Sequence, residues 1–175
     1  MSAPRMFDTS LLIIFTLAFM TYCLGDVIST YVALHHNMDM TEGLSVTSAI
    51  ISAGMHGYLI LLILKTLGLA IFMGMAAYGW WMAMKWTLLG FFIYGSYLTA
   101  SNICVFFLGF PLLPPGDQAS MMGYIWMMVL PFLIAGVAFE TLDAFKIMNG
   151  ETEGHGIWGK ELRHFISSRR KSQSE

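Results

Sequence analysis

Charged residues are scarce in this chain: they make up 11% of its 175 residues, whereas about a quarter is usual in soluble domains. Apolar residues make up 57%, and the mean hydropathy is +0.66. These values exclude an ordinary soluble domain and a disordered chain. The net charge is −2, so there is no excess of positive charge and a basic nucleic-acid-binding protein is excluded as well.

Cysteine and catalytic motifs are also nearly absent. The two cysteines, Cys23 and Cys104, both lie inside apolar runs, which excludes a disulfide framework and a CxxC metal or redox motif. The sequence contains no HExxH motif, no P-loop and no convincing Ser/His/Asp set. It therefore favours a protein that is not an enzyme.

Long apolar runs are abundant instead, and a membrane-spanning helix needs about 20 such residues. Four runs meet this length: 10–36, 55–80, 84–110 and 120–148. No small-x-small cleavage site follows the first run, so we interpret it as a retained helix and not as a signal peptide. Pro131 lies inside the last run and is expected to kink that helix.

The expected fold is all-α: a four-helix transmembrane bundle in residues 1–150, followed by a tail in residues 151–175. The segment 44–51 is apolar but too short to span, which predicts an interfacial or re-entrant helix at the outer face. In the tail, apolar residues recur at helical spacing and Arg169-Arg170-Lys171 follows them. This pattern predicts a cytoplasmic amphipathic helix, placed on anionic inner-leaflet lipids or against a partner subunit.

Positive charge indicates the orientation in the membrane. The segments 37–54 and 111–119 contain no Lys or Arg, whereas Lys85 and the tail carry positive charge. Cytoplasmic loops are enriched in Lys and Arg, so we predict a cell-membrane protein with both termini in the cytoplasm.

Ionisable residues inside apolar runs are costly, which makes them the first candidates for function. Asp26 and Lys65 each lie ten residues from the predicted outer end of their helices, and Asn102 lies nine residues before Pro111. At ~1.5 Å per residue all three lie ~15 Å below the outer surface. Thr30 is one turn from Asp26 and joins the same polar layer.

Two interpretations of this layer stay open. A buried Asp26–Lys65 pair could fix the register of the helices, because an unpaired charge at this depth is untenable. Alternatively, the layer is a binding site for a proton, an ion or a polar substrate near the middle of the membrane. Near the inner end of the last helix, Glu140, Asp143 and Lys146 predict an interfacial ion cluster.

Soft metal ligands gather near the predicted outer surface. Imidazole and thioether groups together suit copper, and no other part of the chain combines them so closely. The residues concerned are His35, His36, Met38, Met40 and His56. The alternative is that these methionines fill helix interfaces, as most of the 15 methionines would. A bis-histidine haem is not expected, because His35 and His56 are near helix ends.

A short pattern of polar residues runs through the first part of the chain. Asp26 and Thr30 form Asp-x-x-x-Thr in the first helix, Glu42 begins a short segment, and Lys65 lies in the next span. In this pattern the chain resembles a family of small prokaryotic multi-pass membrane proteins of unknown function. Members of that family carry Glu-Asn-Pro, whereas Gly43 and Leu44 follow Glu42 here. The resemblance covers about residues 20–70 and implies no activity.

Two functions are compatible with these features. The first is an accessory, assembly or structural subunit of a larger membrane complex, or a homo-oligomer. The second is a small carrier or metal-handling protein that uses the Asp26, Lys65 and Asn102 layer or the outer His/Met group.

Overall fold

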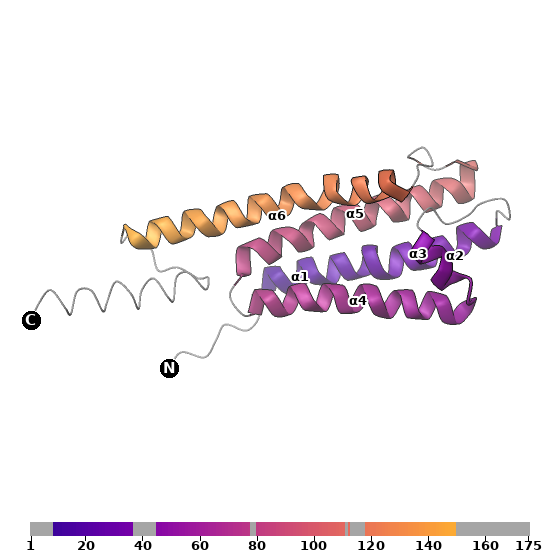
Figure 1. Ribbon diagram of the computed structural model, residues 1–175, viewed down its shortest axis with the longest axis horizontal. Helices are drawn as coiled ribbons and strands as arrows, with labels where there is room; N and C mark the ends of the chain where they lie inside the picture. Colours follow the sequence, from indigo (N-terminus) through magenta and orange to yellow (C-terminus); the bar gives the residue numbers. More distant parts are fainter. Residues whose placement is uncertain (1–8, 37–44, 78–79, 111, 113–117, 150–175) are drawn as a thin grey trace, which may run out of the picture.

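The structure is a computed structural model that describes residues 9–36, 45–77, 80–110, 112 and 118–149, and every regular element in these ranges is a helix (Figure 1). The elements are α1 (Thr9–Ala18), η1 (Phe19–Gly25), α2 (Asp26–His36), α3 (Ser45–Ile51), α4 (Met55–Ala77), α5 (Trp81–Leu108) and α6 (Gln118–Met148). The predicted tail, residues 151–175, lies outside the described residues.

Four helical stretches are long and apolar enough to cross a membrane: Thr9–His36, Met55–Ala76, Trp81–Leu108 and Gly123–Lys146. The first combines α1, η1 and α2 without a break. The all-helical architecture and the four candidate spans agree with the sequence analysis. The chain is thus a multi-pass helical membrane protein, and the apolar surfaces of its helices would contact lipid.

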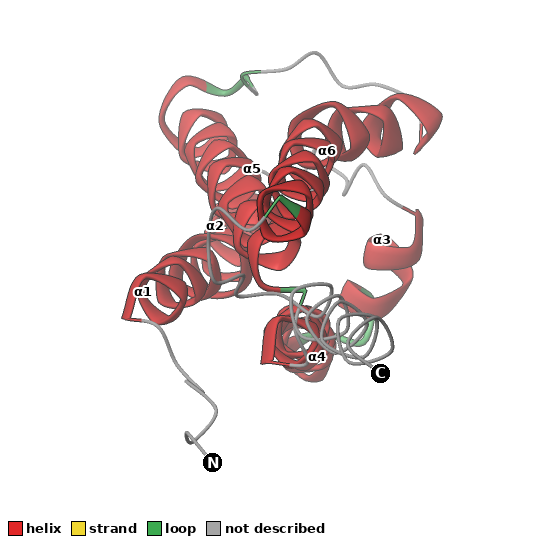
Figure 2. Ribbon diagram, turned by 90° about the vertical axis from the view of Figure 1, so that its left-hand side faces the viewer, coloured by secondary structure: helices red, strands yellow, loops and turns green. Residues whose placement is uncertain are grey.

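Helix α5 is the centre of the assembly. It packs against α1, η1, α2, α4 and α6, whereas α6, among the described residues, makes its extensive contacts with α5 alone. Figure 2, which looks along the bundle, shows α6 beside α5 and apart from α4. The short helix α3 packs against α4 on the side of the bundle where α4 and α6 lie apart, which we call the open side. The expected four-helix bundle is therefore a core of three spans, which are Thr9–His36, α4 and α5, with α6 attached to α5.

The ends of α5 differ from the prediction. The helix begins at Trp81, three residues before the expected start at 84, because its first turn is capped from another helix. The Met82 N–H donates to Glu140 Oε2 at 2.9 Å. Glu140 is 6% exposed and lies beside the positive end of the helix dipole. Its carboxylate therefore serves as a helix cap, whereas the ion cluster of Glu140, Asp143 and Lys146 stays a prediction.

The other end of α5 stops at Leu108, two residues before the predicted end. Gly109 follows with a φ of 76°, which is the left-handed conformation that ends many helices, and its N–H donates to the Val105 carbonyl at 3.0 Å. Helix α6 continues through Pro131 as one helix.

Candidate functional site

The polar site begins with an irregularity in the first span. Residues Phe19–Gly25 form a π-helix, in which the backbone hydrogen bonds span five residues, where an unbroken α-helix was expected. At its end the Asp26 N–H donates to the carbonyls of Thr21 and Cys23. It does not donate to the carbonyl of Tyr22, which lies between them in the sequence. Such segments leave a backbone acceptor exposed and are frequent at functional sites.

Helix α5 holds this π-helix at close range. A Cβ added to Gly95 would overlap the backbone of Tyr22, so only glycine allows this approach. The Thr21 hydroxyl donates to the Phe92 carbonyl at 3.2 Å, and the Thr99 hydroxyl donates to the Thr21 carbonyl at 3.2 Å. These two bonds join the π-helix to α5.

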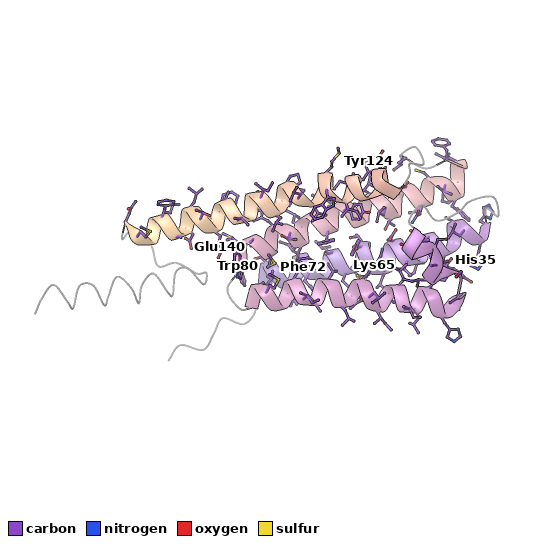
Figure 3. All side chains as sticks on the ribbon, in the orientation of Figure 1. His35, Lys65, Phe72, Trp80, Tyr124 and Glu140 are labelled. Atoms are coloured by element: carbon purple, nitrogen blue, oxygen red, sulfur yellow. The ribbon has the colours of Figure 1, made fainter. Side chains whose placement is uncertain are left out.

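Lys65, about halfway along α4, reaches this irregularity (Figure 3). Its ammonium forms an ion pair with Asp26 Oδ2 and donates to the Tyr22 carbonyl at 3.3 Å. The same Nζ lies 4.5 Å from the centre of the Tyr22 ring, within the range of a cation–π contact. The side chains of Lys65 and Asp26 are only 13% and 11% exposed.

Asn102 completes the cluster from α5. Its Nδ2 lies 3.2 Å from Asp26 Oδ1, 3.0 Å from Ser29 Oγ and 2.9 Å from Thr30 Oγ1. Both carboxylate oxygens of Asp26 therefore have partners. The four residues predicted as a polar layer, Asp26, Thr30, Lys65 and Asn102, lie together in the structure, and we refer to them as the polar cluster. Its formal charge is zero.

A cleft of about 310 Å³ borders the polar cluster on the open side of the bundle. Its lining residues come from η1, α2, α3, α4, α5 and α6, and most of them belong to α4 and α5. The lining residues are Tyr22, Asp26, Thr47, Leu61, Leu64, Lys65, Gly68, Leu69, Phe72, Phe91, Tyr94, Leu98 and Ile125. The cleft is thus mostly apolar, with the ion pair as its charged part. Sequence reasoning missed it because it depends on how α6 sits on α5.

The outer residues predicted from the sequence are described only in part, so the metal site stays a prediction. Glu42, Met38 and Met40 lie outside the described residues. His35 Nδ1 donates to the Tyr31 carbonyl at 2.9 Å, and the His36 ring centre is 4.5 Å from that of Phe106. Within the described ranges, no three His, Cys, Asp or Glu residues are placed to hold a metal ion. His56, at the start of α4, is exposed.

No family model, curated protein or solved structure matches this chain. The resemblance noted above therefore depends on its short motifs alone.

Proposed function

We propose that this chain is a non-enzymatic membrane protein that binds a small lipophilic molecule in the cleft, with the polar cluster holding the polar group of that molecule. The observation that supports this proposal most is the position of the Asp26–Lys65 pair in the wall of the cleft. The sequence by itself favours a subunit role over a carrier role. The cleft favours the second.

The surroundings of the pair favour binding over a purely structural role. The desolvation of a buried ion pair is repaid only where further hydrogen bonds satisfy its remaining donors and acceptors. Here both members border open volume. Small-molecule sites typically occupy about 300–1,000 Å³ and combine apolar walls with a few polar groups, and the cleft of about 310 Å³ has this character.

Gly68 offers a direct test, because it lines the cleft and a Cβ added there would meet nothing within 4 Å. Gly68→Leu should therefore fill the cleft without disturbing the helix contacts. Gly74 lies on the same helix, also has open space around it and does not line the cleft, so Gly74→Leu is the matched control.

Mass spectrometry of lipids that copurify in mild detergent should detect one lipophilic molecule enriched on the natural protein and on Gly74→Leu. Gly68→Leu should lose it. Equal content in all three proteins, or no enriched molecule, would overturn the proposal.

A subunit role is the second candidate, and the attachment of α6 through α5 alone within the described ranges favours it. The lipid-facing surfaces of α6 would then contact other membrane subunits, and the tail would lie on anionic lipid or on such a partner. Purification in mild detergent followed by protein mass spectrometry tests this role. Stoichiometric partner proteins would support it, whereas a homogeneous small oligomer would favour the binding role.

We further propose that both termini are cytoplasmic. The start of α1 and the end of α6 lie at the same end of the bundle, as an even number of spans requires (Figure 1), and the Lys and Arg distribution assigns that end to the cytoplasm. Single cysteines at Ser172 and Asn37, on a cysteine-free background, provide the measurement. In right-side-out vesicles an impermeant reagent should label position 37 only. Labelling of position 172 alone would reverse the topology.

A further inference from the structure

We infer that the molecule bound in the cleft is uncharged and carries a carbonyl oxygen on a planar ring, as in a quinone, and that this oxygen accepts a hydrogen bond from Lys65. This inference rests on the proposed function and specifies its ligand. Three properties of the site lead to it: its charge, its available hydrogen-bond donor and the side chains of its wall.

The charge of the site disfavours an ionic ligand. Asp26 and Lys65 compensate each other, and they are the two charged residues among those that line the cleft. An anionic or cationic headgroup would add a charge without a partner, which is costly inside a membrane. A neutral headgroup leaves the balance of the pair unchanged.

The hydrogen bonds of the site call for an acceptor. An ammonium group has three N–H donors. Among the described residues, those of Lys65 go to Asp26 Oδ2 and to the Tyr22 carbonyl, which leaves the third for an acceptor in the cleft. The Asp26 oxygens already accept from Lys65 and Asn102. The third N–H of Lys65 therefore provides a donor for a carbonyl oxygen of the ligand.

The wall beside the ion pair is aromatic. The ring centres of Tyr22 and Phe91 are 5.0 Å apart, and those of Phe72 and Phe91 are 5.2 Å apart. All three residues line the cleft. Aromatic side chains favour offset or edge-on contact with another flat ring, so this wall suits a planar headgroup better than a flexible chain.

The size and opening of the cleft agree with a ring that carries a tail. Its volume of about 310 Å³ is roughly twice that of an engineered cavity that binds benzene. Leu64 lines the cleft and is 51% exposed, so the cleft opens onto the lipid-facing surface of α4. A substituted ring can thus lie inside while an apolar tail extends into the bilayer.

Binding of four ligands with the same ten-carbon chain to the protein in lipid nanodiscs tests the inference by calorimetry. The ligands are a decyl-substituted benzoquinone, decanol, decanoate and decylamine. We expect the quinone to bind at least tenfold more tightly than the other three. Phe91→Leu should weaken quinone binding several-fold and leave decanol binding unchanged, and Gly68→Leu should abolish quinone binding while Gly74→Leu retains it.

The outcomes separate this inference from the proposed function. If decanol, decanoate or decylamine binds as tightly as the quinone and Gly68→Leu blocks that binding, the quinone-type ligand is refuted while the cleft stays a binding site. If none of the four ligands binds, the inference is refuted, and the copurification experiment above decides the proposed function independently. Equal quinone binding by Gly68→Leu and Gly74→Leu would place the ligand outside the cleft and also refute the inference.

Discussion

Replacing one member of the Asp26–Lys65 pair should destabilise the protein more than replacing both. Asp26→Leu leaves the Lys65 ammonium with the Tyr22 carbonyl, and Lys65→Met leaves the Asp26 carboxylate with the Asn102 amide. Removing one partner of a buried ion pair costs about 3–5 kcal/mol. If the two residues were independent, the double variant would therefore lose about 6–10 kcal/mol.

The contacts around the pair give a much smaller expected loss for the double variant. No charge remains in it, and apolar replacement of a whole buried pair is often close to neutral. Asn102 keeps the hydroxyl oxygens of Ser29 and Thr30, at 3.0 and 2.9 Å. The Tyr22 carbonyl loses its Lys65 donor, and a buried acceptor without its partner costs about 1–3 kcal/mol. The coupling between the two sites should therefore be at least about 3 kcal/mol.

Unfolding by SDS in mixed detergent micelles measures these free energies for the natural protein, both single variants and the double variant. A control cycle pairs Asp26→Leu with Lys85→Met, because Lys85 donates to Ser10 at 2.8 Å and has no described contact with Asp26. That control cycle should be additive. If the Asp26 and Lys65 losses are also additive, the reasoning about the pair is refuted.

Two further predictions concern helix contacts. Glu140→Ala removes the acceptor for the Met82 N–H and should lower the free energy of unfolding by about 1–3 kcal/mol, whereas Glu140→Gln retains an acceptor and should lower it less. Hydrogen exchange of the Met82 amide should be faster in Glu140→Ala, and an unchanged rate would contradict the capping role. Gly95→Ala should lower the free energy of unfolding by about 1–3 kcal/mol, because the new Cβ overlaps the Tyr22 backbone. Gly74→Ala is the control, because a Cβ there enters open space. Equal melting temperatures for these two variants would argue against the close contact.

The polar cluster could be predicted from the sequence because it depends on two strong constraints. The rise of a helix is constant, so counting residues from the outer ends places Asp26, Lys65 and Asn102 at one depth. A charge inside a membrane needs a compensating partner, so the acid and the base are expected to meet. The spans follow from the length of the apolar runs in the same way.

The π-helix, the Glu140 cap and the cleft depend on the tertiary structure. Membrane helices are apolar on all sides, so their sequences carry little periodic signal for which faces meet. The approach of Gly95 to Tyr22 and the capping of Met82 by Glu140 arise from shape and backbone hydrogen bonds between residues far apart in the chain. The cleft exists because α6 packs on α5 and leaves the side towards α4 open, and this arrangement is decided by helix–helix packing that no single run of residues encodes.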